Sequence, residues 1–176
     1  MTNRLLKYAV FALVALVAFG AGLWFSAPRQ TEAPAASAAD AIYALNLPDI
    51  ESKPQRMEQW RGKVLVVNLW ATWCAPCREE IPIFVKLQEK YRAQGLQFVG
   101  ISIDQVDKTS EFARNFGINY PTLIGAFDTI EVSRRAGNQR GVLPYTVVLD
   151  RKGQIVATEL GGLTHEKLEL LVQPLL

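Results

Sequence analysis

Two apolar segments separated by a helical pattern constrain the fold of this chain more than any other feature. Residues 63–70 form a nearly continuous run of β-branched and other apolar residues, which is typical of a central strand buried on both faces. Residues 76–94 carry apolar side chains at helical spacing and end at Gly95, a common helix stop. Residues 96–103 have the pattern of a second strand. A strand, a helix and a strand in this order predict a right-handed parallel crossover.

The rest of the globular part predicts a mixed sheet covered by helices. Residues 145–149 and 154–160 flank a turn signal at Asp150 to Gly153, so we expect an antiparallel hairpin. Thr164 is a predicted cap of the last helix, with Leu168, Leu171 and Val172 facing inward. Weaker patterns predict a helix at 108–116, a short strand at 120–124 and a helix at 127–136. The predicted fold class is therefore α/β, with a central sheet that is parallel in its middle, has a hairpin at one side and is flanked by helices.

Composition excludes several classes of protein. The chain has 176 residues and a formal charge of +2, and from Ile42 onward it has 16 basic and 15 acidic residues, which does not match a nucleic-acid binder. Two cysteines and one histidine cannot supply the three or four ligands that zinc sites usually take unless carboxylates complete the set, and we expect no metal site. They also exclude a small domain held together by many disulfides.

The chain begins with an apolar segment long enough to cross a membrane. Arg4 and Lys7 precede an uncharged run over residues 8–25, and 18 to 21 residues at about 1.5 Å each span roughly 30 Å. Residues 1–25 are therefore predicted to be a signal-anchor transmembrane helix. A cleaved signal peptide is the alternative, but a cut behind Ala27 would place the bulky Phe25 three residues before it.

The basic flank and the segment after the apolar run predict where the domain lies. Basic residues before the run and Trp24 at its far end indicate an N-terminus in the cytoplasm. Residues 26–41 are rich in Ala, Pro and Ser and are predicted to be a flexible linker. Residues 42–176 are close to the usual size of one domain. We expect a single-pass protein of the inner membrane whose C-terminal domain lies in the periplasm.

Cys74 and Cys77 lie at the junction between the first predicted strand and its helix. Cysteines three apart at a helix start share one turn, so their sulfurs can form or break a bond with little backbone change. Cys74 would occupy the first turn, where free N–H groups and the helix dipole favour a thiolate. Cys77 would be the resolving thiol. Pro76 suits a helix start because it lacks an N–H that would have no partner there.

Three other uses of these cysteines compete with redox chemistry. The two cysteines could be half of the ligand set of a zinc ion, but the site would need further soft ligands. The chain has no other cysteine, and its single histidine, His165, lies near the last predicted helix. A c-type haem anchor needs a histidine directly after Cys77, where the chain has Arg78. A purely structural bridge would close a loop of about four residues, worth only about 2 kcal/mol by the chain-entropy estimate. Dithiol–disulfide exchange is the reading we favour.

Two polar residues are candidates for proton transfer or hydrogen bonding at this pair. On a helical wheel Glu79 falls some 200° from Cys77 and is expected in solvent, whereas Glu80 falls about 60° away, beside the apolar stripe. Partial burial would raise the pKa of Glu80 and let it exchange a proton with Cys77. The alternative is a second surface carboxylate. Asn68 is either a satisfied buried amide or a hydrogen-bonding element behind the cysteines.

Pro144 comes immediately before the predicted hairpin. Because proline cannot join a central ladder, it marks a strand start or a tight bend, with either a trans or a cis bond. If this loop packs against the cysteine turn, the backbone of Leu143 could pair with an extended substrate segment that carries the target cysteine.

These residues form a long pattern: Asn68-x-Trp70-Ala71-Thr72-Trp73-Cys74-Ala75-Pro76-Cys77-x-x-Glu80-x-Pro82, Gly141-Val142-x-Pro144-x-Thr146 and Asp150-x-x-Gly153. Over about residues 53–175 the chain resembles the membrane-anchored thioredoxin-like proteins of the TlpA/ResA type. The resemblance implies a thioredoxin-like fold with an insertion around 119–136 and a cis bond before Pro144. It also implies Cys74 as nucleophile, Cys77 as resolver and an active-site role for Glu80. We further expect Trp73, Leu143 and Pro144 to contact the substrate.

The resemblance also implies the partners of the protein. They are client proteins with disulfides and a membrane thiol reductase that returns electrons, and the only redox group expected is the Cys74–Cys77 disulfide, without a cofactor. The branch dedicated to cytochrome c maturation usually has Gly-Ala-Pro-Glu at the proline, where this chain has Val142-Leu143-Pro144-Tyr145. Strong oxidants carry Pro-His between the cysteines, and Ala75-Pro76 lacks the imidazole, which favours reduction. A disulfide oxidase or isomerase with the same cysteines and a non-enzymatic tethered adaptor are the alternatives.

Overall fold

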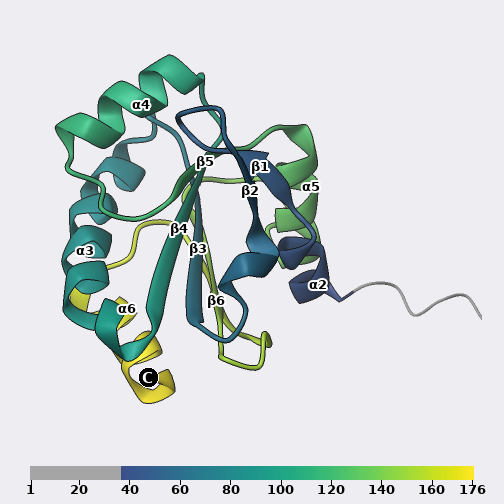
Figure 1. The fold of residues 1–176 in the computed structure, drawn as a ribbon, viewed down its shortest axis with the longest axis vertical. Helices are drawn as coiled ribbons and strands as arrows, with labels where there is room; N and C mark the ends of the chain where they lie inside the picture. Colours follow the sequence, from purple (N-terminus) through teal and green to yellow (C-terminus); the bar gives the residue numbers. More distant parts are fainter. Residues whose placement is uncertain (1–36) are drawn as a thin grey trace, which may run out of the picture. The chain divides into compact units, whose positions relative to one another are not determined.

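The computed structural model describes residues 37–176, which form a central sheet with helices on both faces (Figure 1). The expected transmembrane helix at 1–25 and most of the expected linker at 26–41 lie outside the described residues. Among residues 37–176, no helix is both long and apolar enough to cross a membrane. In chain order the elements are α2 (Ala38–Tyr43), β1 (Asn46–Pro48), β2 (Pro54–Arg56), η1 (Met57–Trp60), β3 (Val64–Trp70), α3 (Ala75–Tyr91), η2 (Arg92–Gln94), β4 (Leu96–Ser102), α4 (Val106–Asn115), β5 (Thr122–Ile124), α5 (Phe127–Arg135), β6 (Tyr145–Leu149), β7 (Ile155–Leu160), α6 (His165–Val172) and η3 (Gln173–Leu175).

The five-stranded sheet has the order β5-β4-β3-β6-β7. Strands β3, β4 and β5 are parallel to one another, whereas β6 is antiparallel to β3 and pairs with β7 as an antiparallel hairpin. The predicted mixed α/β sheet is thus confirmed. Strand β3 lies at the centre, so the loop that follows it opens at the middle of one sheet end.

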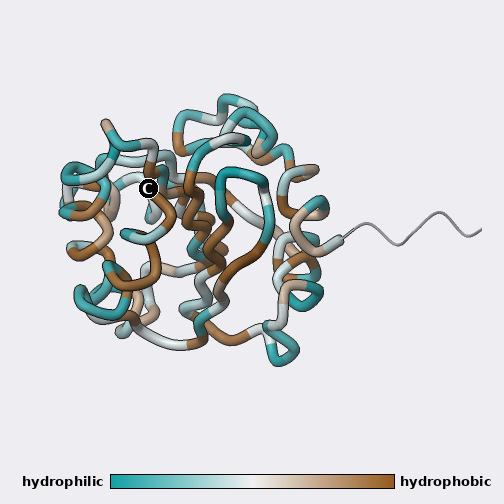
Figure 2. The backbone as a smooth tube through the Cα atoms, turned by 90° about the horizontal axis from the view of Figure 1, so that it is seen from below, coloured by the Kyte–Doolittle hydropathy of each residue, from teal (hydrophilic) through white to brown (hydrophobic). Residues whose placement is uncertain are grey.

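Residues of β3 alternate between the two faces of the sheet, as the two-residue period of a strand requires. Leu65, Val67 and Leu69 join a core that α2, η1 and α5 cover, while Val64 and Val66 join a second core under α3 and α6. Figure 2 shows the hydrophobic residues gathered along the central strands. Every residue of β3 is buried, which agrees with the continuous apolar run in the sequence.

The N-terminal edge of the domain differs from the sequence prediction. The expected boundary between linker and domain, after Ala41, falls inside α2, whose Ile42 and Tyr43 are buried in the core. Strands β1 and β2 form a small antiparallel hairpin that the sequence patterns did not indicate. Three-residue strands are too short to show a period, and Pro48 and Pro54 argue against strand in a sequence reading.

The last helix begins where the sequence places it. Thr164 is the N-cap of α6, and its side chain accepts a hydrogen bond from the Lys167 N–H. Leu168 and Val172 are buried in the core, whereas Leu171 is half-buried. The helix therefore packs against the sheet with the face that its spacing predicts.

Candidate active site

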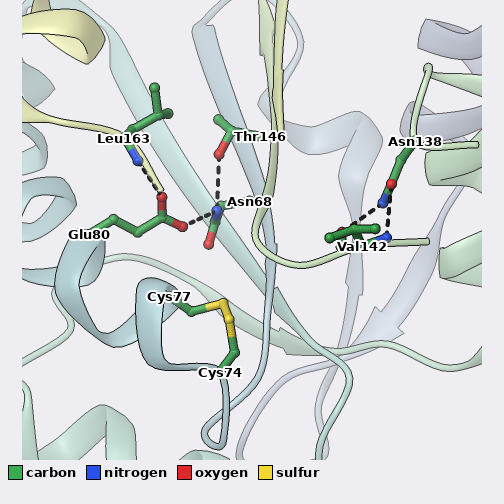
Figure 3. The surroundings of a disulfide bond; sticks show 8 residues. All are labelled: Asn68, Cys74, Cys77, Glu80, Asn138, Val142, Thr146 and Leu163. Atoms are coloured by element: carbon green, nitrogen blue, oxygen red, sulfur yellow. Dashed lines mark hydrogen bonds between the residues drawn. A yellow bond between two sulfur atoms is a disulfide. The ribbon is translucent and has the colours of Figure 1, made fainter. Parts of the chain in front are cut away.

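Cys74 and Cys77 lie where β3 passes into α3, and they are joined by a disulfide bond (Figure 3). Their Cα atoms are 5.3 Å apart. Cys74 is the N-cap residue of α3, one position before the first turn in which we expected it, and Pro76 lies in the first turn. Cys74 retains 6% exposure, whereas Cys77 has none. Cys74, at the helix start, is therefore the cysteine that another molecule can reach.

Glu80 is buried one helical turn beyond Cys77. The side chain is 1% exposed, while Glu79 points into solvent, as the helical wheel predicts. One carboxylate oxygen accepts from the Asn68 amide at 2.8 Å and the other from the Leu163 N–H at 3.0 Å. Burial raises the pKa of Glu80 to about 7, although the two hydrogen bonds act in the opposite direction. Near neutral pH this carboxyl can thus release or take up a proton.

Asn68 lies in the middle of β3 and forms part of the same polar cluster. Its amide group donates one hydrogen bond to Glu80 and another to the Thr146 hydroxyl on β6, at 2.8 and 3.0 Å. Its carbonyl oxygen is buried and has no hydrogen-bond partner among the described residues. Asn68 is therefore not a fully satisfied amide, and its hydrogen bonds link Glu80 on α3 to Thr146 on β6 (Figure 3).

The loop before β6 contains two of the expected substrate contacts, Leu143 and Pro144. The Leu143–Pro144 bond is cis, as the family resemblance implies. Leu143 packs against the cluster of buried residues that contains both cysteines. Pro144 is buried, whereas the expected substrate contact Trp73 is 67% exposed. The structure thus brings Leu143 to the cysteine turn and leaves Trp73 free beside it.

Three further contacts at the site were not predicted from the sequence. The Leu163 N–H is a backbone group, so no residue type in the sequence signals its contact with Glu80. The side chain of Asn138 forms hydrogen bonds with the backbone of Val142. The sequence did not predict this contact, because a Gly-Asn pair such as Gly137-Asn138 indicates only a turn. Arg78 is exposed, and its guanidinium carbon lies 5.7 Å from the ring centroids of Phe112 and Phe116.

Metal ligation does not compete for these side chains in the described part of the chain. Within residues 37–176, no three His, Cys, Asp or Glu side chains lie together as a metal site would require. The cysteines bond to each other, and Glu80 is held by hydrogen bonds. The chemistry that this arrangement supports is reversible exchange between a dithiol and a disulfide.

A mixed sheet flanked by helices, with a disulfide at the helix start after the central strand and a cis-proline loop beside it, defines a thioredoxin-like thiol–disulfide oxidoreductase. The chain belongs to the Redoxin family, whose model matches residues 29–171. Within that family it is an oxidoreductase of the TlpA/ResA type, as the resemblance in its motifs implies.

Similar proteins support this assignment. The chain is 28% identical over 170 residues to the thiol-disulfide oxidoreductase ResA of Geobacillus kaustophilus. This alignment covers 95% of this chain and 93% of the relative. The ResA protein of Bacillus anthracis is also 28% identical, over 95% of this chain and 94% of its own length. Among solved structures, a thioredoxin-family thiol:disulfide interchange protein from Chlorobium tepidum has a TM-score of 0.69 at 27% identity, covering 74% of this chain and 92% of its own.

Proposed function

We propose that this protein is a membrane-anchored, extracytoplasmic reductase that reduces disulfides of client proteins through Cys74 and Cys77. The observation that carries the proposal is the unequal exposure of two disulfide-bonded cysteines at one helix start, with the buried carboxyl of Glu80, whose pKa is raised, one helical turn after the enclosed Cys77. Oxidoreductases of this class act on protein disulfides, and the curated relatives bear the name thiol-disulfide oxidoreductase.

The first step forms a mixed disulfide. In the reduced protein the Cys74 thiolate attacks one sulfur of a client disulfide, and the other client sulfur leaves as a thiolate. The N-terminus of α3 supports the thiolate because its first N–H groups have no intrahelical partner and the helix dipole is positive there. Leu143 packs against the buried cluster that contains Cys74, and Trp73, next to Cys74 in the chain, is exposed. With Pro144, these are the residues that we expect to contact the client.

The second step releases the client. The Cys77 thiolate attacks the Cys74 sulfur, so that the second client sulfur departs as a thiolate and the Cys74–Cys77 disulfide forms. The client gains two electrons and this protein loses two. Cys77 is fully enclosed, so its proton needs a nearby acceptor, and Glu80 with a pKa of about 7 can take it at neutral pH.

The direction of exchange is inferred from the residues between the cysteines. Ala75 and Pro76 place no imidazole there, in contrast to strongly oxidising proteins of this fold. A reductase must be reduced again after each cycle. A membrane thiol reductase that carries electrons from the cytoplasm is the donor that a membrane-tethered domain could meet.

The N-terminal segment supports the proposed location. Residues 1–25 combine a basic start with an apolar run of membrane-spanning length. The alignment with the Geobacillus kaustophilus relative covers 95% of this chain. Residues 37–176 are a smaller share of the 176 residues, so the alignment extends into the N-terminal region. We propose that the segment holds the protein in the inner membrane and that the domain lies in the periplasm.

The reduction potential of the Cys74–Cys77 pair tests the direction. The full-length protein is equilibrated with glutathione or dithiothreitol buffers, and the fraction of disulfide is followed by thiol alkylation. We expect a value near that of thioredoxin, about −270 mV. A value near about −120 mV, that of a strong oxidant, would overturn the reductase proposal in favour of a disulfide oxidase.

A further inference from the structure

The side-chain amide of Asn138 holds both backbone polar groups of Val142. The Val142 N–H donates to Asn138 Oδ1 at 3.0 Å, and Asn138 Nδ2 donates to the Val142 carbonyl at 3.0 Å (Figure 3). Two residues of adjacent antiparallel strands exchange the same pair of bonds. Asn138 is 3% exposed and Val142 is 40% exposed, so the two bonds are partly shielded from water. We call this arrangement the Asn138 clamp.

Helix α5 fixes the clamp in place. The Asn138 N–H donates to the Ser133 carbonyl at 2.9 Å, and Asn138 Nδ2 also donates to the Ser133 hydroxyl at 3.3 Å. The Asn138 carbonyl accepts from the Gly141 N–H at 3.0 Å. If the amide were rotated by half a turn, its NH₂ group would face the Val142 N–H and its oxygen would face the Val142 carbonyl, so that both hydrogen bonds would be lost. The side chain therefore has one orientation.

The clamp determines which backbone groups of the active-site loop remain free. Val142 is fully engaged, the Gly141 N–H is taken, and Pro144 has no N–H while its carbonyl accepts from Gly161. Within residues 141–144, Leu143 alone has an N–H and a carbonyl that both lack a partner in the described chain. Leu143 also packs against the buried cluster that contains Cys74 and Cys77.

We propose that Asn138 is a positioning residue that sets the register of the client on this protein. By engaging Val142, the clamp leaves Leu143 as the one loop residue that an extended client segment can pair with, and it thus aligns the client cysteine with Cys74. It also holds the loop in shape before the client arrives, so less order has to be gained on binding. The partner is an extended polypeptide with a cysteine in a disulfide. The inference rests on the proposed function, because it requires a polypeptide client.

Two variants and two substrates test the clamp. Asn138→Asp keeps an acceptor for the Val142 N–H but places an oxygen against the Val142 carbonyl, and Asn138→Ala removes both bonds. The reduced full-length protein is mixed with a disulfide-linked peptide or with 5,5′-dithiobis(2-nitrobenzoate), which has no peptide backbone. We expect the second-order rate constant for the peptide to fall about tenfold in Asn138→Ala and by a smaller factor in Asn138→Asp. The rate with the small disulfide should change less than about twofold, since docking through Leu143 is not involved.

Asn119→Ala is the matched control. Its amide donates to the Val85 carbonyl on the surface, so this variant loses one side-chain-to-backbone bond outside the loop and should keep both rates. Equal losses with the peptide and the small disulfide in the Asn138 variants would show that Asn138 acts on the cysteines themselves, and would overturn the inference. Unchanged peptide rates in folded variants would overturn it as well.

If the Asn138 variants do not fold, the client register can still be tested in a protein that keeps Asn138. Cys77→Ala traps the mixed disulfide between Cys74 and the peptide, and amide hydrogen exchange is followed by NMR in the full-length chain. We expect the Val142 amide to be protected with and without peptide, and the Leu143 amide to become protected only in the mixed disulfide. Free exchange at Leu143 in the mixed disulfide would refute the register. A wild-type protein that reacts with the small disulfide but not with the peptide would refute the proposed function, and the inference with it.

Discussion

Glu80 is a carboxylic acid in a place that disfavours its charge. The side chain is buried, and its two oxygens accept hydrogen bonds only from neutral groups, the Asn68 amide and the Leu163 N–H. Neutral donors compensate part of the lost hydration, so the net effect of burial is a raised pKa. A buried carboxyl with a raised pKa reduces the stability of the fold at neutral pH, and in the proposed mechanism it accepts the proton of Cys77.

The stability of the oxidised protein should therefore depend on pH through Glu80. Its pKa rises from 4.5 in the unfolded chain to about 7 in the fold, so the unfolded state loses its proton first as pH increases. The contribution of Glu80 to the free energy of unfolding is highest below pH 4.5 and falls between about pH 4.5 and 7, by about 3 kcal/mol in total. In Glu80→Gln this titration is absent, so the variant should gain stability relative to wild type over that interval.

Denaturant unfolding at several pH values between about 4 and 8 measures the difference between variant and wild type. Glu79→Gln removes the same charge on the same helix at an exposed position and is the matched control. A Glu80→Gln difference that does not grow with pH, or that grows equally in the control, would contradict the raised pKa.

At the scale of elements, the sequence predicts long segments well and short ones poorly. Strands β3 and β4 match their predicted ranges to within one residue, because seven-residue segments rich in apolar and β-branched side chains are distinctive. The helical wheel of α3 correctly predicted that Glu80 lies on the buried side of the helix, because the angles between residues of one helix are fixed by the sequence alone. The hairpin of β1 and β2 was missed because each strand has only three residues.

The N-cap of α6 is a predicted feature whose energy can be measured. The Thr164 hydroxyl accepts from the Lys167 N–H, one of the first N–H groups of the helix that lack an intrahelical acceptor. We expect Thr164→Ala to lower the free energy of unfolding by about 1 kcal/mol. Thr164→Ser keeps the hydroxyl and should lose much less. Equal losses in the two variants would assign the effect to the methyl group instead of the cap.

At the scale of the whole molecule, the site is assembled from segments far apart in the chain. Glu80 receives a bond from Leu163, 83 residues later, and Asn68 bonds to Thr146, 78 residues later. Such contacts depend on the order of strands and on how helices pack over them, so a pattern within one segment does not indicate them. The sequence identified the cysteines and Glu80, and the fold supplied the groups that hold Glu80 and Asn68 in place.

The proposed N-terminal anchor would affect the whole molecule, because it would keep the domain at the membrane and so limit the proteins that the domain can contact. An uncharged run over residues 8–25 is long enough for the hydrocarbon core of a bilayer, and a small polar segment follows it. We expect the full-length protein, expressed in a bacterium with two membranes, to remain in the membrane fraction after alkaline carbonate washing. In spheroplasts an external protease should degrade its domain, since the domain would lie on the outer side of the inner membrane.

Replacing residues 1–25 with a cleavable signal peptide is the control, because it keeps export and removes only the anchor. That variant should be released as a soluble periplasmic protein with the same rate of peptide disulfide reduction in solution, since Cys74, Cys77 and Glu80 are unchanged. We expect this variant to lose its function in cells, because it would be separated from the proposed electron donor in the membrane. A wild-type protein that is itself soluble and begins near Pro28 by intact mass would show that the segment is a cleaved signal peptide, and the domain would have to meet its electron donor by free diffusion.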